Sequence, residues 1–187
     1  MTRARPARVA EFAAGRAAAR QAMAALGLPP CAVAMRPDRA PDWPAGLVGS
    51  IAHDNGLCLA ALARAADLRG IGIDIEPAQD LPAGLIDEIT TPRERDWLAD
   101  LDAGGRGRMA RMIFAAKEAT YKALYPLSQQ VVGFDAMQVL PDSHDQGFEA
   151  TLARAFGPYR PGTILNGRCA WAEGRVIAAL ILPMAEN

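Results

Sequence analysis

Hydrophobic positions in the first third of the chain change from a helical spacing to a strand-like spacing. Residues 9–26 are rich in alanine, and Gly27 with two prolines soon after it supplies a stop, so this segment is expected to form a helix. Residues 36–46 contain three prolines, which indicates an extended loop. The apolar runs at 47–51 and 57–63 are typical of short strands.

In residues 70–76 isoleucine alternates with glycine or an acidic residue, which predicts a third strand. Its three isoleucines would face one side of the strand, and Gly72, Asp74 and Glu76 would face the other. Two positions along a strand separate α-carbons by roughly 6 to 7 Å. Both carboxylates can therefore reach one cation.

Two helices are expected in the middle of the chain. Thr91, Pro92 and Glu94 form a capping-box pattern that predicts a helix running to about residue 101. Residues 102–107 should break it, and a longer helix should run over 108–125, where a proline ends it. One side of that helix is an apolar stripe of Met109, Met112, Ile113, Ala116, Ala123 and Leu124, and the opposite side carries Arg111, Glu118 and Lys122.

Residue 131 onward is dominated by apolar runs separated by turn residues. The runs at 131–140, 148–152, 164–171 and 176–182 predict strands. Helices and strands are mixed without regular βαβ alternation, which favours an α+β fold class.

Composition limits the classes of function. The 187 residues, 51% hydrophobic and 22% charged, suit one folded domain or two small halves sharing a core. A formal net charge of -1 gives no whole-protein attraction to nucleic acid. Lys117 and Lys122 are the only lysines, so any bound anion must be held by a local cluster.

Cysteine usage and hydropathy indicate the compartment. The three widely spaced cysteines form neither a disulfide framework nor a zinc motif, and they are expected to be reduced and buried. No apolar run approaches the roughly 20 residues that cross a bilayer, and the N-terminus lacks a secretion signal. We expect a cytoplasmic protein without a membrane span.

The carboxylates Asp74, Glu76 and Glu118, flanked by basic residues, suit a magnesium ion that bridges phosphate oxygens. Magnesium prefers oxygen ligands and commonly takes some of them from a phosphorylated substrate. Each feature alone also has a simpler reading. Asp74 and Glu76 can be exposed strand residues, and Glu118 with Lys122 can be a surface pair at i and i+4.

Two segments form a pair of signature motifs, GIGIDIE at 70–76 and FAAKEATYKAL at 114–124. Three further segments agree with them, EFAAGRAAAR at 11–20, RAPDWP at 39–44 and GSIAH at 49–53. Together these five segments resemble the 4'-phosphopantetheinyl transferases, in particular the subgroup that serves siderophore and other secondary-metabolite synthases. The resemblance covers most of residues 8–140. Members of the subgroup usually begin with extra residues, so this chain is expected to lack an N-terminal strand or to start late.

The resemblance implies a phosphopantetheinyl transferase fold over residues 1–187, a single domain and a monomer. Two pseudo-symmetric α/β halves, 1–90 and 91–187, would hold coenzyme A and magnesium in the cleft between them. It further implies roles for individual residues. The implied metal ligands are Asp74, Glu76 and Glu118, the implied catalytic residues are Glu118 and Lys122, and the implied coenzyme A ligands are Arg16, Arg20, Arg39, His53, Lys117 and Lys122.

The implied reaction is attack by a serine of an apo acyl or peptidyl carrier protein on the β-phosphate of coenzyme A, with 3',5'-ADP leaving. Glu118, or a water bound to the metal, would take the serine proton, and Lys122 would stabilise the leaving group. Two other functions stay open from the residues. The chain could be a catalytically weak coenzyme A-binding module, or another magnesium-dependent phosphate-ester enzyme that uses water in place of serine.

Overall fold

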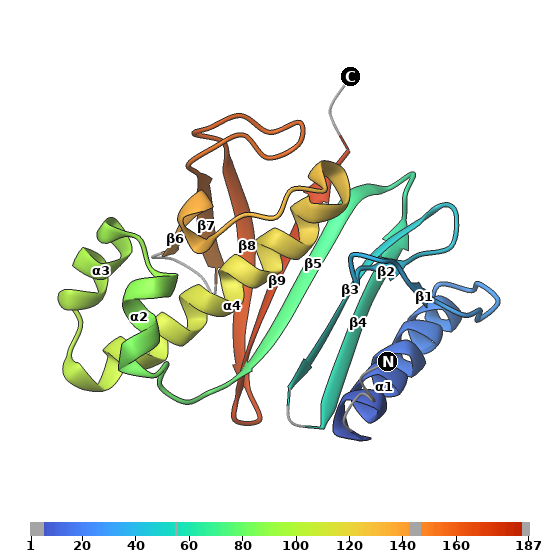
Figure 1. Cartoon of the computed structure of the whole chain (residues 1–187), viewed down its shortest axis with the longest axis horizontal. Coiled ribbons are helices and arrows are strands. Elements are labelled where there is room, and N and C mark those ends of the chain that lie inside the picture. The colour runs from blue at the N-terminus through green and yellow to red at the C-terminus, as the bar shows by residue number, and fades with distance from the viewer. Residues whose placement is uncertain (1–5, 55, 143–146, 185–187) are drawn as a thin grey trace.

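The order of helices and strands divides the chain into an N-terminal unit and a larger C-terminal unit (Figure 1). The computed structural model describes residues 6–54, 56–142 and 147–184. The N-terminal unit contains α1 (Pro6–Ala25), β1 (Ala34–Met35), β2 (Pro41–Asp42), β3 (Leu47–Asp54) and β4 (Leu57–Arg64). The C-terminal unit contains β5 (Leu68–Pro77), α2 (Ala83–Ile89), α3 (Pro92–Ala99), α4 (Ala103–Ser128), the 3-10 helix η1 (Phe134–Ala136), β6 (Met137–Pro141), β7 (Gly147–Leu152), β8 (Ile164–Ala172) and β9 (Arg175–Pro183). Within these ranges no helix is long and apolar enough to cross a membrane.

The N-terminal unit is a two-stranded antiparallel sheet of β3 and β4 covered by α1 (Figure 1). The alanine-rich sequence of α1 lets it pack closely, and its fully buried residues Ala19 and Met23 meet Val33 in a small core. The opposite face of the β3–β4 sheet packs on β5, where Ala52 contacts the isoleucine side of that strand. The isoleucine alternation thus serves to join the two units.

The C-terminal unit is a five-stranded antiparallel sheet in the order β5-β9-β8-β7-β6, with α4 across one face (Figure 1). α4 presents its predicted apolar stripe to the sheet, and Met112, Ile113, Ala116, Ala123 and Leu124 are all buried there. The side chains of β7, β8 and β9 that face α4 complete the main hydrophobic core. The α+β class is confirmed.

The boundary between the units differs from the predicted halves at 1–90 and 91–187. β5 pairs along its length with β9, from Leu68 opposite Pro183 to Pro77 opposite Arg175. α2 packs on α4. Residues 68–90 therefore belong with the second unit, because β5 pairs with a strand about a hundred residues later in the chain, which places it in the C-terminal sheet.

The ends of α3 and α4 show which of the predicted helix start and stop signals act in the structure. The capping box is confirmed, because Thr91 accepts from the backbone of Glu94 and the Glu94 side chain accepts from the backbone of Thr91. The predicted break at 102–107 and the end of the long helix at 125 are wrong. Asp102 caps α4 by accepting from the backbone N of Gly105 at 2.7 Å, and Pro126 lies inside its last turns. A side-chain cap offsets the low helix propensity of the glycines that follow.

The three cysteines are free thiols in different environments. Cys31 is exposed, Cys58 is half-buried and Cys169 is buried. The expectation of buried thiols therefore holds for Cys169 alone.

Candidate active site

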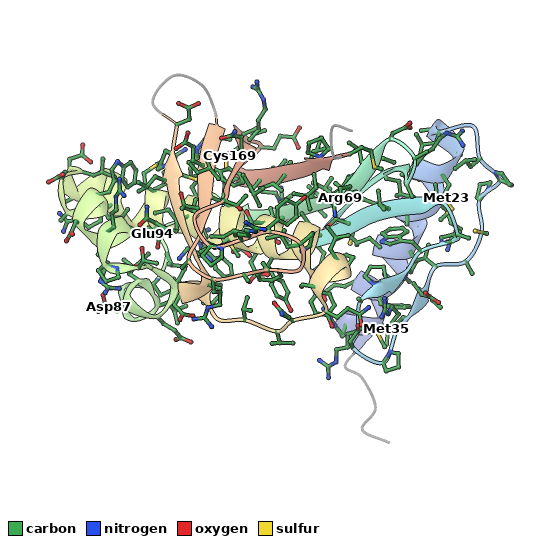
Figure 2. All side chains as sticks on the ribbon, turned by 90° about the horizontal axis from the view of Figure 1, so that it is seen from above. Met23, Met35, Arg69, Asp87, Glu94 and Cys169 are labelled. Atoms are coloured by element: carbon green, nitrogen blue, oxygen red, sulfur yellow. The ribbon has the colours of Figure 1, made fainter. Side chains whose placement is uncertain are left out.

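A cleft of about 800 Å³ lies between the two units. Its walls come from α1, the β1–β2 hairpin and β3 on one side, and from β5 and α4 on the other. Met35, labelled in Figure 2, belongs to the hairpin and lines the cleft. The N-terminal side carries Arg8, Arg16, Arg36 and Arg39 together with the carboxylates of Glu11, Asp38 and Asp42, and the C-terminal side carries Asp74, Glu76, Glu118 and Lys122.

Close packing of β5 on α4 positions the acidic side of the cleft. A Cβ atom on Gly72 would lie 1.8 Å from the carbonyl O of Ala119, so glycine lets the strand touch the helix backbone. Asp74 and Glu76 follow on the same face of the strand, and Glu118 precedes Ala119 on the helix. All three carboxylates line the cleft, as the sequence predicted for a shared site.

Two of these carboxylates already have cationic partners. Lys122 Nζ donates to Asp74 Oδ1 at 2.6 Å and to the carbonyl O of Ile73 at 3.2 Å. Arg111 Nη1 donates to Glu76 Oε2 at 2.8 Å, and its other nitrogens donate to backbone carbonyls in the turn after β5. Arg111 is a site residue that the sequence analysis placed on the helix face without assigning a partner.

Burial raises the pKa of all three carboxyl groups. For Asp74 the desolvation outweighs the attraction of Lys122, and its pKa lies above the ordinary value. Burial is also the largest cause of the raised pKa of Glu76 and of Glu118, and the negative charge of Asp74 raises both further. Carboxyl groups with raised pKa values that line the same cleft are a site that a cation would stabilise.

The chemistry of this donor set fits a magnesium ion. Asp74 Oδ2 is buried and has no hydrogen-bond partner in the part of the chain that the structure describes, and carboxylate oxygen is the ligand type that magnesium prefers. The described residues nevertheless contain no preformed cage, because no three His, Cys, Asp or Glu side chains are gathered closely enough to hold an ion. The carboxylates share the cleft, but two of them are engaged by Lys122 and Arg111.

Lys117 is placed differently from the prediction that it approaches the phosphates. Its side chain is 1% exposed and forms an ion pair of 2.8 Å with Glu94, which is 0% exposed. Its Nζ also donates to the carbonyl oxygens of Ile89 and Phe134 at 2.8 and 2.9 Å. Figure 2 labels Glu94, which extends from α3 toward the protein interior.

Helix geometry explains why the two lysines separate. Five residues at about 100° each turn Lys122 roughly 140° away from Lys117 around α4. Only one of them can face the cleft. Lys122, whose side chain is 28% exposed, lines it, and Lys117 points toward α3 and η1. The helical period was available in the sequence and could have made this distinction.

Arg16, Arg39 and His53 all line the N-terminal side of the cleft, and their predicted role in binding coenzyme A stays a prediction. Arg16 is buried, and its Nε and Nη2 donate to the carbonyl oxygens of Val33 and Ala34 at 2.8 and 3.2 Å. Burial lowers the pKa of Arg16. Arg39 reaches the cleft from the turn of the β1–β2 hairpin.

Arg20 does not line the cleft and is exposed, so its predicted role in binding coenzyme A has no support in its position. It lies one helical turn beyond Arg16, past the end of the cleft. The sequence analysis missed Arg8 and Arg36, which do line it. Arg8 donates to His53 Nε2 at 3.0 Å. Its spacing of eight residues from Arg16 puts both on one face of α1, a signal that could have found it.

Comparison with known families decides the identity of the fold and site. Residues 1–63 match the 4'-phosphopantetheinyl transferase N-terminal domain, and residues 70–163 match the 4'-phosphopantetheinyl transferase superfamily. The chain belongs to the 4'-phosphopantetheinyl transferase superfamily. The gap between the matched segments falls where β4 ends and β5 begins. The strand pairing places the boundary between the two units of the transferase at the same point.

Three characterised relatives are similar to this transferase over most of its length. It is 41% identical to 4'-phosphopantetheinyl transferase Svp of Streptomyces mobaraensis over 184 residues, which cover 96% of this chain and 74% of the relative. It is 37% identical to 4'-phosphopantetheinyl transferase Npt of Nocardia iowensis, covering 91% and 80% of the two chains. Enterobactin synthase component D of Escherichia coli (strain K12) is 33% identical, over 75% of this chain and 69% of that one.

These similarities establish the reaction and the subgroup. The chain is a transferase that moves the 4'-phosphopantetheine group from coenzyme A to carrier proteins. One of its relatives is named as a component of enterobactin synthase, and the others as 4'-phosphopantetheinyl transferases.

Proposed function

We propose that coenzyme A binds along the cleft with its pyrophosphate beside Asp74, Glu76, Glu118 and Lys122. The observation that supports this placement is the gathering of Asp74, Glu76, Glu118 and Lys122 on one side of a cleft of about 800 Å³ whose other side carries Arg8, Arg16, Arg36 and Arg39 among its charged residues. A doubly charged ion between carboxylates and phosphates would balance both sets of negative charge. The arginines on the other side would then contact the 3'-phosphate of the nucleotide.

Asp74, Glu76 and Glu118 are the residues that would hold magnesium, and the ion would supply charge neutralisation on the phosphate oxygens. The unpartnered Asp74 Oδ2 supports this assignment. Lys122, which donates to Asp74, is the one lysine in the cleft lining that can turn toward a phosphate. Arg111 keeps Glu76 oriented from outside the cleft lining.

Glu118 is the proposed base for the carrier serine. As the serine oxygen bonds to the β-phosphorus, the bond from that phosphorus to the bridging oxygen of 3',5'-ADP breaks, and the serine proton passes to Glu118. The raised pKa of Glu118, caused mainly by burial, makes its carboxylate a better proton acceptor. Lys122 stabilises the negative charge that develops on the leaving 3',5'-ADP.

The nucleotide is assigned to the N-terminal side of the cleft. The family resemblance implied that Arg16, Arg39 and His53 bind coenzyme A, and Arg8 and Arg36 join them in the cleft lining. Several guanidinium groups around one phosphate are a common way to bind it. Lys117 and Arg20 have no part in this proposal.

Incubation with coenzyme A, magnesium and an apo carrier protein tests the proposal. Mass spectrometry should show the carrier gaining one phosphopantetheine group, and Asp74→Asn and Glu118→Gln should abolish most of that gain. Glu149→Gln is the matched control, because Glu149 is an exposed carboxylate on β7 outside the cleft lining. Normal turnover of Glu118→Gln at saturating magnesium would refute both roles given to Glu118.

The same assay separates the other functions left open by the sequence. Tight binding of coenzyme A without carrier modification would support a weak binding module. Release of phosphopantetheine in the absence of carrier would support a hydrolase. Comparison of fatty-acid, polyketide and peptide-synthase carriers identifies the preferred partner. The monomeric state and the cytoplasmic location stay predictions, testable by light scattering and by cell fractionation.

A further inference from the structure

The β1–β2 hairpin, residues 34–42, forms a large part of the N-terminal wall of the cleft. Only two residue pairs, Ala34 with Asp42 and Met35 with Pro41, join its strands. Its turn carries Arg36 and Arg39 into the cleft lining. A two-stranded hairpin of this size is marginally stable by itself, so its position depends on contacts with the rest of the protein.

Asp38 organises the turn of this hairpin. Its Oδ1 accepts from the backbone N of Ala40 at 3.0 Å, inside a turn closed by two backbone hydrogen bonds of 2.9 Å, Arg36 N to Ala40 O and Arg39 N to Arg36 O. Arg39 has a positive φ of 70°, which an arginine adopts only when its surroundings hold it there. The carboxylate of Asp38 therefore helps to fix the directions of Arg36 and Arg39.

The two ends of the hairpin are held by different units. At its base, Arg16 of α1 donates to the carbonyl oxygens of Val33 and Ala34. At its turn, the hydroxyl of Tyr125 donates to Asp38 Oδ2 at 2.9 Å. Tyr125 lies near the end of α4, three residues after Lys122 and 87 residues after Asp38. This bond crosses from the C-terminal unit to the N-terminal wall of the cleft.

We propose that Tyr125 is a positioning residue for coenzyme A. Its hydrogen bond to Asp38 holds the turn of the β1–β2 hairpin against α4, so that Arg36 and Arg39 stay beside the bound nucleotide. This inference rests on the proposed placement of the nucleotide at the arginine side of the cleft. It assigns Tyr125 to substrate retention and gives it no part in the phosphoryl transfer itself.

The chemistry of the pair suits a hydrogen bond from a neutral hydroxyl to a charged carboxylate. Hydrogen bonds from Ala40 and from Tyr125 lower the pKa of Asp38, so its carboxylate is in the charged form that accepts strongly at neutral pH. The same bond is the largest cause of the raised pKa of Tyr125, which keeps its hydroxyl proton available. Because the contact is solvent-exposed, its loss should weaken binding without unfolding the protein.

The test is Tyr125→Phe, which removes one hydroxyl oxygen and keeps the ring. KM for coenzyme A should rise roughly three- to tenfold, with kcat changed less than about twofold. Hydrogen exchange should accelerate in the backbone of residues 34–42. Tyr159→Phe is the matched control, since Tyr159 lies outside the cleft lining and should change neither quantity.

A double-mutant cycle with Asp38→Ala distinguishes a direct contact from a general effect of the ring. In the Asp38→Ala background, Tyr125→Phe should have no further effect on KM. Additive effects of the two substitutions would overturn the proposal. So would an unchanged KM in Tyr125→Phe, or a fall in kcat alone.

A separate substitution keeps the two proposals distinguishable. If Arg36→Ala and Arg39→Ala leave coenzyme A affinity unchanged, the placement of the nucleotide is wrong. The result for Tyr125→Phe still decides whether the hairpin contact controls substrate retention.

Discussion

The two walls of the cleft are built in different ways. The C-terminal wall stands on the main hydrophobic core, where α4 touches β5 at Gly72 and Lys117 forms its buried ion pair with Glu94. The N-terminal wall has a small core around Ala19 and Met23, and a hairpin held by two residue pairs and a few side-chain hydrogen bonds.

This difference matches the demands that the proposed reaction makes on each wall. Carboxylates that hold a metal and take a proton must be placed within a fraction of an ångström, which close packing achieves. A wall that grips a nucleotide must let it enter and leave, and a hairpin with few contacts can move at little cost. The main hydrophobic core thus positions the reacting groups, and the β1–β2 hairpin at the surface retains the substrate.

Lys117→Met should produce the largest loss of stability. It leaves the Glu94 carboxylate buried without its cation, which costs about 3 to 5 kcal/mol of unfolding free energy. Urea unfolding followed by circular dichroism measures this loss. Arg16→Met is the comparison in the N-terminal wall, and it should cost less, since Arg16 donates to backbone carbonyls and has no carboxylate partner among the described residues. Equal losses would break the contrast between the walls.

Lys122→Met should affect turnover more than folding. Lys122 lines the cleft, and removal of a cation that stabilises transition-state charge commonly lowers kcat by roughly 10²- to 10³-fold. Its unfolding free energy should fall less than that of Lys117→Met, because the side chain of Lys122 is partly exposed. Steady-state transfer to an apo carrier gives kcat. Turnover close to the wild-type value would remove Lys122 from the proposed mechanism.

Gly72→Ala tests whether close packing places the carboxylates. The added Cβ would meet backbone atoms of Ala119 and Ala123, so α4 must move, at a cost of about 1 to 3 kcal/mol and with a loss of activity. Gly84→Ala is the control in α2, where no atom lies within 4 Å of the new Cβ. That substitution should stabilise the protein by about 0.4 to 1 kcal/mol. Thermal unfolding of both variants measures the difference, and similar shifts would count against the packing argument.

The rate of cysteine alkylation compares how accessible the two units are to solvent in the unmutated protein. This is the smallest of the expected effects. At neutral to mildly alkaline pH, iodoacetamide should label exposed Cys31 first and buried Cys169 last. Burial raises the pKa of Cys169 from 9.0 to about 12. Its contribution to stability is therefore complete below about pH 9 and lost as the pH rises toward 12. Mass spectrometry of digested protein reports the order, and early labelling of Cys169 would contradict it.

Local signals predicted much of the candidate site. Alternation in β5 put Asp74 and Glu76 on one face, and the helical period put Glu118 and Lys122 opposite the apolar stripe, as the structure has them. The capping box at Thr91 was also readable. The local pattern did not reveal that the carboxylate of Glu94, which belongs to this capping box, also forms an ion pair with Lys117 of a different helix.

Several features were beyond the reach of local patterns. Nothing within 68–77 tells that β5 pairs with the last strand of the chain. Nothing near residue 38 tells that Tyr125 reaches it from the end of α4. The sequence did not tell which arginines of α1 line the cleft. In the structure Arg8 and Arg16 line it and Arg20 does not.

By itself the sequence determined the class of fold, the signature strand and helix, and the side chains that each of them presents on one face. Periodicity is a property of neighbouring residues, and it acts through the fixed geometry of a helix or a strand. Tertiary structure alone decided which elements meet, which lysine is buried, and which cations engage the carboxylates. Those outcomes depend on burial and hydrogen bonding between residues far apart in the chain, whose free energy is set only when the whole core forms.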